Sequence, residues 1–349
     1  MFLGIEIGGT KLQLGVGDGR RPELAARQRL DIDAQRGAEG ILAQIQQAAG
    51  GLMQRFPVAC IGIGFGGPVD TAAGRVVLSH QVDGWRDFEL AAWCHRTLGV
   101  PAVLGNDCDS AALAEASYGA GAGKQTVFYV TVGTGIGGGF VKHGVLHGAG
   151  RPASAEIGHL RPGLHADRPA VTVESLASGP GIAAAAKAGV RGAVVLPLRA
   201  ESPPDSLESG TRDRPSAIAE RADQADRREL VERAGGELEN VTAKLVGEAA
   251  ADGNRLAIEV LDRACQVLGW AIAQMITLLA PEIVVVGGGV SLLGEELFFA
   301  PLRQAVQRYV FPPLAGAYEI VPAALGEWVV VHGAIGLAAE QRGVLEGRA

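Results

Sequence analysis

The sequence predicts an α/β protein built from two domains, and three observations lead to this prediction. The chain has 349 residues, which is more than a single hydrophobic core usually spans. Short apolar runs alternate with longer helical patterns along most of its length. A unit of apolar strand, glycine-rich turn and second strand occurs twice, at residues 2–16 and 126–142. The repeat predicts an internal duplication whose two copies face a shared cleft.

The composition is that of a soluble globular enzyme, with 48% hydrophobic and 20% charged residues. A net charge of −7 leaves no basic surface for nucleic acid or for an anionic membrane. The four cysteines, at positions 60, 94, 108 and 265, form no C-x-x-C pair. The N-terminus has no basic leader, and no apolar run reaches the ~20 residues that span a bilayer. We therefore expect a cytoplasmic protein with reduced thiols.

The first part of the chain reads as strands and helices in alternation. Strands are predicted at 2–7, 12–16, 58–65 and 101–104, because each is a short apolar run that ends at glycine or a polar residue. Helices are predicted at 37–54, 87–98 and 109–118, where apolar or alanine positions recur at helical spacing.

The second part repeats the opening unit and then becomes more helical. Strands are predicted at 126–132, 140–142 and 283–286, with a glycine turn over 133–139 between the first two. Helices are predicted at 235–251, 255–280 and 333–345, and one begins near Ser291. Residues 198–230 have little periodicity and read as a mobile insertion. We expect a small domain of residues 1–115 plus 333–349 and a larger domain of residues 116–332.

Three glycine clusters follow three of these strands, at residues 8–9, 133–139 and 287–289. Glu6, Thr10 and Lys11 flank the first cluster, and a carboxylate beside hydroxyl and amide donors suits a phosphate with hydrated Mg²⁺. Thr134 lies in the second cluster, whose successive amides can bind an anion. Glycine ends many strands, so one such cluster alone is weak evidence. None fits the P-loop or dinucleotide-binding pattern, which argues against a P-loop enzyme and a Rossmann dehydrogenase.

A set of polar residues follows the strands as well: Asn106 and Asp107, Glu156 and His159, and Glu174. Taken singly, Asp107 reads as the N-cap of the helix at 109–118, His159 as a core histidine, and Glu174 as a surface charge. A helical turn would place Glu156 and His159 on one face. Together the five offer the several fixed acceptors that a hydroxyl-rich substrate needs.

These stretches resemble the ROK family of bacterial sugar kinases, which has the two-domain actin-like ATPase (ribonuclease H-like) fold with a cleft between the domains. The resemblance covers nearly the whole chain and is carried by Glu6-Ile7-Gly8-Gly9-Thr10-Lys11, Gly64-Phe65-Gly66-Gly67-Pro68, Asn106-Asp107, Gly133-Thr134-Gly135, Glu156-Ile157-Gly158-His159, Glu174 and Val286-Gly287-Gly288-Gly289.

The resemblance implies an ATP-dependent kinase for a hexose or an N-acetylhexosamine, with Mg²⁺. Asp107 would be the general base. The sugar hydroxyls would be held by Gly67, Asn106, Glu156, His159 and Glu174. The nucleotide and its phosphates would be bound by Glu6, Gly8, Gly9, Thr10, Lys11, Gly133, Thr134, Gly135, Gly287, Gly288 and Gly289. The family also implies a homodimer.

The chain departs from the family pattern at three places. Glu6 stands where the family usually has aspartate, and Gln81-Val82-Asp83-Gly84-Trp85 replaces an Asn-Leu-x-Gly-Trp turn. Residues 160–173 contain no cysteine, although the family commonly binds structural zinc there through three cysteines and the histidine. We therefore predict no zinc, and we rate His165 and Asp167 as poor substitute ligands.

Two alternatives to a sugar kinase remain open at this point. Some members of the family are repressors with a DNA-binding domain ahead of the kinase-like part, but this chain starts directly on the phosphate-binding hairpin. A catalytically impaired sugar- or nucleotide-binding protein is the other alternative, and Glu6 and the missing cysteines are its support. The sequence does not separate the hexoses from one another, nor ATP from another phosphoryl donor such as polyphosphate.

Overall fold

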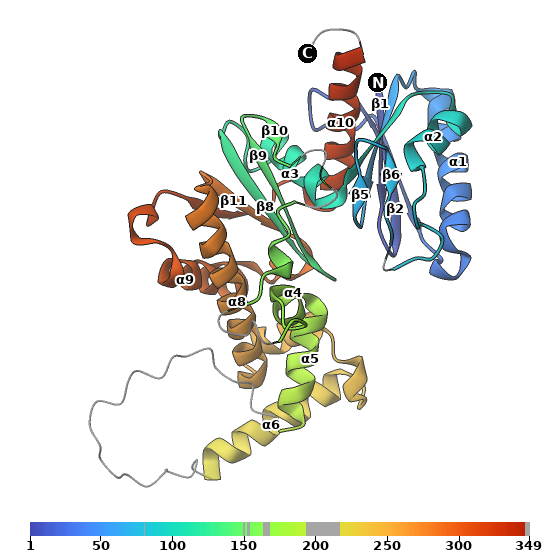
Figure 1. The fold of residues 1–349 in the computed structure, drawn as a ribbon. Coiled ribbons are helices and arrows are strands. Elements are labelled where there is room, and N and C mark those ends of the chain that lie inside the picture. The colour runs from blue at the N-terminus through green and yellow to red at the C-terminus, as the bar shows by residue number, and fades with distance from the viewer. Residues whose placement is uncertain (80, 149–150, 152–153, 163–167, 193–216, 346–349) are drawn as a thin grey trace.

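The computed structural model describes residues 1–349 except 80, 149–150, 152–153, 163–167, 193–216 and 346–349. Two five-stranded sheets organise the described residues (Figure 1). The first sheet contains β1 (Phe2–Ile7), β2 (Lys11–Gly17), β3 (Ala26–Asp31), β4 (Cys60–Phe65) and β7 (Ala102–Asn106). The second contains β8 (Thr126–Val132), β9 (Ile136–Lys142), β10 (Val145–Leu146), β11 (Ile283–Gly287) and β12 (Glu319–Pro322). We call the parts built on these sheets the first half and the second half.

The two sheets have the same topology, which bears out the predicted duplication. The strand orders are β3-β2-β1-β4-β7 and β10-β9-β8-β11-β12. In each sheet the first three strands of the order pair antiparallel and the last two join in parallel. The parallel strands β1, β4 and β7 therefore end at one edge of the first sheet, and β8 and β11 end at one edge of the second. Ligand sites of open α/β sheets lie at such edges.

The first half carries helices on the face of its sheet away from the second half (Figure 1). These helices are α1 (Gly37–Arg55) and α2 (Leu90–Leu98), and a small ribbon of β5 (Val69–Asp70) and β6 (Arg75–Val76) lies nearby. Apolar side chains of α1, such as Ile41, Ile45 and Leu52, join those of β1, β2 and β4 in one buried core. The predicted helix at 87–98 begins later, at Leu90, because Asp87 has a positive φ of 51° that a helix does not allow.

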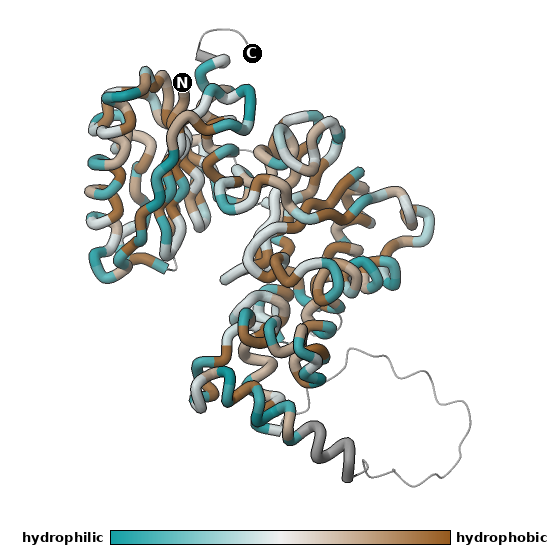
Figure 2. Tube along the Cα trace, turned by 180° about the vertical axis from the view of Figure 1, so that it is seen from behind, coloured by the Kyte–Doolittle hydropathy of each residue, from teal (hydrophilic) through white to brown (hydrophobic). Residues whose placement is uncertain are grey.

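The second half carries most of the remaining helices: α4 (Val173–Ala177), α5 (Gly179–Val190), α6 (Ala217–Arg233), α7 (Ala243–Ala251), α8 (Arg255–Leu279) and α9 (Ala300–Tyr309). Figure 2 shows hydrophobic residues along the strands of this half and hydrophilic residues on the outer helix α6. The long helix α8 supplies much of the core beneath β8 and β11.

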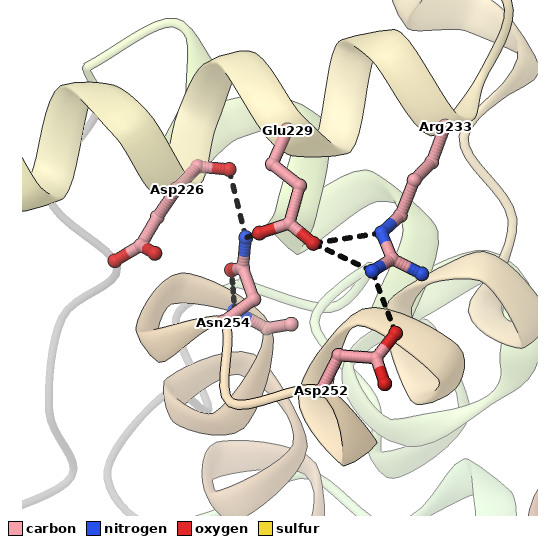
Figure 3. Close-up of polar contacts among 6 residues, drawn as sticks. Asp226, Glu229, Arg233, Asp252 and Asn254 are labelled. Atoms are coloured by element: carbon pink, nitrogen blue, oxygen red, sulfur yellow. Dashed lines mark hydrogen bonds and ion pairs between the residues drawn. The ribbon is translucent and has the colours of Figure 1, made fainter.

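Helix α6 is fastened to the turn between α7 and α8 by a polar cluster (Figure 3). The guanidinium of Arg233 lies 2.6 Å from carboxylate oxygens of both Glu229 and Asp252. The Asn254 side chain is buried, donates to the Asp226 carbonyl (2.9 Å) and to Glu229 (3.0 Å), and caps α8 by accepting from the Ala257 N–H. Part of the predicted mobile insertion, residues 217–230, is thus helical, and Asp226 and Glu229 within it contact Asn254. Its residues 198–216 lie outside the described residues.

Two helices lie between the halves: α3 (Asp107–Tyr118), which follows β7, and α10 (Val329–Leu345), which ends the described chain (Figure 1). The sequence predicted that a C-terminal helix packs back on the first half, and α10 does pack on β1 and β4 as well as on α3. Contact is close at Gly333, where a Cβ atom would lie 2.8 Å from the Cα of Ser110. A third apolar core joins Ala111 and Ala114 of α3 to Val330 of α10 and to strands β8 and β11.

Two predicted boundaries in the second half are wrong for local reasons. The helix expected at 235–251 begins only at Ala243, because Gly235 and Gly236 have positive φ and the Thr242 hydroxyl caps the helix at the Leu245 N–H. The helix expected near Ser291 starts as a 3-10 turn (Gly289–Leu293) and a π-helical turn (Glu295–Phe299) before α9.

All four cysteines are free and buried. Among the described residues, no helix is both long and apolar enough to cross a bilayer.

Candidate functional site

Three of the predicted segments meet where β1, β4 and β7 end. The Gly66 N–H donates to the Ile7 carbonyl (2.9 Å), which ties the segment after β4 to the Gly8-Gly9 turn after β1. The Asn106 Nδ2 donates to the Gly67 carbonyl (3.1 Å), which ties the end of β7 to the same segment. A Cβ atom at Gly66 would lie 3.5 Å from Oδ2 of Asp107 and 3.7 Å from Cα of Gly8. The Asp107 carboxylate therefore faces the glycine turn predicted to bind phosphate.

The start of α3 fixes the direction of Asp107. Asn106 is the N-cap, because its Oδ1 accepts from the backbone N–H groups of Cys108 (2.8 Å) and Asp109 (3.3 Å). The interpretation of Asp107 as the cap is wrong, since the helix begins two residues earlier than predicted and Asp107 is its first residue. Burial raises the pKa of the Asp107 carboxyl, and the hydrogen bond from the Cys108 N–H opposes this rise.

Glu6, at the end of β1, forms an ion pair with Lys11, whose Nζ lies 3.1 Å from Oε1 of Glu6. The Lys11 ammonium also donates to Gln13 Oε1 (3.0 Å) and to the Glu327 carbonyl (3.4 Å). Burial raises the pKa of Glu6 to about 7, although Lys11 lowers it and the Asp107 charge adds to the rise. Thr10 is exposed at the tip of the hairpin, so its hydroxyl is available to a ligand.

The residues near Glu6 fit a hydrated magnesium ion. Oε2 of Glu6 is buried and has no hydrogen-bond partner among the described residues. Buried polar atoms normally have a partner, so this oxygen suits a contact with a bound ion or its water. The described residues contain no group of three or more His, Cys, Asp or Glu that would hold a metal ion by themselves. Magnesium in phosphoryl-transfer enzymes needs no such cage, because one or two carboxylates and the substrate phosphates hold it.

The glycines at 137–139 differ in role from the sequence prediction, because they lie inside strand β9, which begins at Ile136. Gly137 and Gly139 face α3. A Cβ at Gly139 would lie 2.7 Å from the Ala112 Cβ and 2.8 Å from the Cys108 carbonyl oxygen. Gly138 faces the other way, where a Cβ would lie 2.5 Å from the Ala155 carbonyl oxygen. The bare strand thus admits the first turn of α3 on one face and the segment before Glu156 on the other.

Glu156 and His159 come together as predicted, around a 3-10 turn over Ile157–His159. His159 Nε2 lies 3.9 Å from Oε2 of Glu156, and their side chains are 67% and 44% exposed. His159 is therefore a surface residue beside the site and not a core histidine. Burial raises the pKa of Glu156, His159 lowers it, and the charges of Asp107 and Glu174 raise it further. These two carboxylates therefore lie within electrostatic range of Glu156.

Asp109 is a member of this carboxylate group that the sequence analysis missed. It follows Asp107 by two residues on α3, and its Oδ1 is buried without a hydrogen-bond partner among the described residues. Burial raises its pKa to about 7, with smaller contributions from Glu156 and Asp107. The signal was present in the sequence as a second aspartate in the first helical turn, where capping explains an acidic residue equally well.

Glu174, on α4, connects the sugar-binding set to the second glycine turn. Its Oε2 accepts a hydrogen bond from the Ile136 N–H (2.8 Å), and a Cβ at Gly135 would lie 2.6 Å from the same oxygen. The Gly133 carbonyl accepts from the Gly179 N–H (2.8 Å) at the start of α5. The turn of Gly133, Thr134 and Gly135 is thus held between β8 and two helices, and Thr134 at its tip is exposed.

The third glycine cluster lies beside this turn. Strands β8 and β11 are parallel, so Gly287, Gly288 and Gly289 follow the end of β11 next to the end of β8. A Cβ at Gly133 would lie 4.0 Å from the Gly289 nitrogen. Gly288 has a φ of 89°, and a Cβ there would lie 2.7 Å from the Val132 carbonyl carbon, so only glycine fits. Gly288 and Gly289 are exposed, which leaves room for a ligand.

The turn that replaces the family's Asn-Leu-x-Gly-Trp motif is anchored in the first half. The Trp85 ring is buried edge-on against Phe65 and Phe88, with ring centroids 5.2 and 5.4 Å apart. The side chain of Gln81 lies directly over Gly9, with its Cδ 2.7 Å from where a Cβ of Gly9 would be. Gln81 thus adds a carboxamide beside the glycine turn. The structure does not describe residues 163–167, so His165 and Asp167 lie outside the described residues.

The ROK family model matches residues 2–341 of the chain. The chain belongs to the ROK family. It is 30% identical to the glucokinase of Thermotoga maritima over 344 residues, which cover 98% of each protein. Among solved structures, it resembles a ROK glucokinase from Streptomyces griseus in complex with glucose and AMPPNP, at 27% identity and a TM-score of 0.74, covering 97% of this chain and 99% of that one.

A ROK hexokinase from Thermus thermophilus is similar at 25% identity and a TM-score of 0.75, covering 98% of this chain and 99% of that one. The family and the two-domain actin-like fold predicted from the sequence are thereby confirmed. The expected roles of the individual site residues remain predictions about this chain.

Proposed function

We propose that this ROK protein transfers the γ-phosphoryl group of ATP to a hydroxyl group of a hexose, with glucose as the leading substrate. The broader class, a carbohydrate kinase, is confirmed by its family and its glucokinase relatives. The observation that carries the proposal is the position of Asp107, whose carboxylate faces the Gly8-Gly9 turn and is within electrostatic range of Glu156. The proposed base is thus near both the predicted phosphate turn and a predicted sugar ligand, which supports the proposal.

In this reaction Asp107 accepts the proton of the attacking sugar hydroxyl as the new oxygen–phosphorus bond forms. The bond between the γ-phosphorus and the bridging oxygen breaks, and ADP leaves. Phosphoryl transfer depends mainly on positioning and charge neutralisation, and a positioned base adds about 10²–10⁴-fold. The raised pKa of the half-buried Asp107 makes its carboxylate a better proton acceptor than an exposed aspartate.

The sugar is held by a set of fixed polar groups on both sides of Asp107. Asn106 and Gly67 are already tied to each other, and they border the base. Glu156 and His159 lie at the 3-10 turn that follows β10, and Glu174 contacts the Gly133–Gly135 turn. Carboxylates, an amide and an imidazole suit a polyol, because each accepts or donates to hydroxyl groups.

The nucleotide is bound by backbone amides of the glycine turns. Gly8, Gly9, Thr10 and Lys11 in the first half, and Gly133, Thr134 and Gly135 in the second, offer N–H groups and hydroxyls to the phosphates. Gly287, Gly288 and Gly289 border the adenosine. Magnesium, held through water by Glu6 and by the phosphates, would neutralise charge on the transferred group. Lys11 keeps the Glu6 carboxyl oriented through their ion pair.

The same proposal includes a homodimer in the cytoplasm that needs no zinc. The four buried free thiols suit a reducing compartment. Size-exclusion chromatography with light scattering tests the dimer, and elemental analysis of protein purified without chelator tests the zinc prediction.

A coupled ADP-release assay tests the function. Glucose, fructose, mannose, allose, N-acetylglucosamine and N-acetylmannosamine are compared with Mg²⁺-ATP and, separately, with polyphosphate by sugar-phosphate detection. We expect glucose to give the highest kcat/KM. A preference for an N-acetylhexosamine would contradict the substrate assignment and leave the kinase standing. If no sugar stimulates ADP release while ATP and sugar still raise the melting temperature, the protein is a binding protein and the catalytic proposal is wrong.

A further inference from the structure

Glu115, near the end of α3, lies where the chain passes between the halves. The chain leaves the first half through α3 and residues 119–125, which lead to β8, and it returns through residues 323–328, which lead from β12 to α10. We call these segments the outgoing and the returning crossing. The Glu115 side chain is fully buried although it is a carboxylate.

Both crossings donate backbone hydrogen bonds to this single side chain. Oε2 accepts from the Ala120 N–H of the outgoing crossing (2.8 Å). Oε1 accepts from the Ala324 N–H (2.9 Å) and the Leu325 N–H (2.8 Å) of the returning crossing. These donors are 5, 209 and 210 residues away from Glu115 in sequence. The three bonds have normal lengths, and a carboxylate provides enough lone pairs for all of them.

This arrangement is more than a local cap. A C-terminal carboxylate on a helix is unfavourable beside the helix dipole, so α3 gains nothing locally from an acid at this position. A neutral apolar residue would fill the space and leave three buried N–H groups without partners, at a cost for each. The hydrogen bonds from the two crossings therefore explain why an acid is buried at this position.

We propose that Glu115 is a positioning residue that joins both crossings to α3, so that the two halves move relative to each other about one fixed point. Because α3 begins with Asp107, the same helix carries the proposed base at one end and this junction at the other. When the halves move, α3 and the two crossings then move together, so that the movement changes the position of Asp107. Only the kinetic part of this inference rests on the proposed function.

Glu115→Gln tests the inference, because glutamine keeps the size but offers only one acceptor oxygen where the crossings present donors on both sides. Spin labels are attached after Gln47→Cys on α1 and Glu259→Cys on α8, which are exposed positions on the two halves. The native cysteines are buried, so labelling is selective. The distance distribution between the labels is measured in the free protein by pulsed electron paramagnetic resonance.

We expect Glu115→Gln to broaden this distribution at least about twofold while the circular dichroism spectrum stays unchanged. Leu52→Ala, a cavity variant in the core of the first half, serves as the control, because it destabilises the fold without touching a crossing. It should leave the width unchanged. In the kinase assay, loosened closure should lower kcat and raise the sugar KM together.

Equal widths in Glu115→Gln and the parent protein would overturn the inference, and Glu115 would then be only a buried structural acid. If Glu115→Gln fails to fold, hydrogen exchange of the parent protein decides. The amides of Ala120, Ala324 and Leu325 should then exchange as slowly as core strand amides, although none lies in a strand. Fast exchange at Ala324 and Leu325 would contradict the junction. Neither measurement needs a sugar substrate, so both are independent of the proposed function.

Discussion

The Lys11 ammonium lies 3.1 Å from one oxygen of the Glu6 carboxyl, while the other oxygen is buried without a hydrogen-bond partner among the described residues. The pair orients a carboxylate beside the Gly8-Gly9 turn and leaves one oxygen for a further ligand. Glu6 stands where the family usually has aspartate, so the pair reaches the site through one more methylene group.

We expect Glu6→Gln to raise the Mg²⁺ concentration that gives half-maximal rate by roughly 10- to 100-fold, because the charge that orients the ion's water is lost. Glu6→Asp should keep most of the activity, since the carboxylate remains. Initial rates at saturating ATP and sugar, over a series of Mg²⁺ concentrations, measure both. An unchanged magnesium dependence in Glu6→Gln would remove Glu6 from the proposed site.

Asp109 predicts a pH-dependent stability. Its pKa is raised from 3.8 to about 7 in the folded protein, so the folded state holds this proton more tightly than the unfolded state does. The stabilisation is fully present below about pH 4 and is lost as the pH rises to about 7. Asp109→Asn has no group that titrates at this position and does not lose this stabilisation. As the pH rises over this range, the free energy of unfolding of Asp109→Asn should therefore increase relative to that of the parent protein, by at most about 4 kcal/mol.

Urea unfolding of both proteins at several pH values between 4.5 and 8 measures the difference between their free energies of unfolding. Parallel stability curves would mean that Asp109 does not carry the proton at neutral pH.

The bare face of strand β9 gives a prediction on packing. Gly139→Ala should lower the free energy of unfolding by about 1–3 kcal/mol, because the new methyl group meets the backbone of α3 at Cys108. Gly51→Ala is the matched control, since nothing lies within 4 Å of a Cβ at this position of α1. It should be neutral or stabilise by up to about 1 kcal/mol through helix propensity. Thermal and urea unfolding compare the two, and equal effects would show that α3 does not press on β9.

Glu174 has two proposed roles, binding the sugar and supporting the Gly133–Gly135 turn, and two substitutions should separate them. Glu174→Gln retains an oxygen that can accept from the Ile136 N–H, whereas Glu174→Ala cannot. We expect both variants to raise the sugar KM, and only the alanine variant to raise the KM for ATP, by about 10-fold, because the Gly133–Gly135 turn loses its support. Equal ATP KM values in the two variants would show that the turn does not depend on Glu174.

Sequence reasoning predicted seven strands of the two sheets and the duplication of the opening unit, because buried strands are short apolar runs with clear ends. It missed β3, β10 and β12. It misplaced boundaries where single residues decide, such as Asp87 and Gly235 with their positive φ. It also assigned all glycines of 133–139 to a phosphate turn. Gly137 and Gly139 instead allow α3 to pack closely against β9. This role depends on a tertiary contact with a helix that is separate from β9 in the sequence.

The candidate site was predicted mainly from motifs. Its segments after β1, β4 and β7 lie together beside Asp107, and the roles of its members remain predictions. What the sequence could not show is the partner of each group. Asp109 reads as an ordinary acid in a first helical turn, and only burial beside Glu156 distinguishes it. Glu115 lies inside the predicted helix at 109–118, and its three backbone donors come from the two crossings. Gln81 lies over Gly9 because the turn anchored by Trp85 places it there.

The most direct test of the central claim is the rate of the chemical step in Asp107→Asn. Single-turnover phosphorylation of glucose by the parent protein and by Asp107→Asn is followed with excess enzyme, and glucose binding is measured by calorimetry on both. The account predicts a fall in rate of about 10²–10⁴-fold with glucose affinity changed less than about tenfold, because asparagine keeps the shape and loses the base. A variant that transfers phosphate at the rate of the parent protein would contradict the assignment of Asp107 as the base.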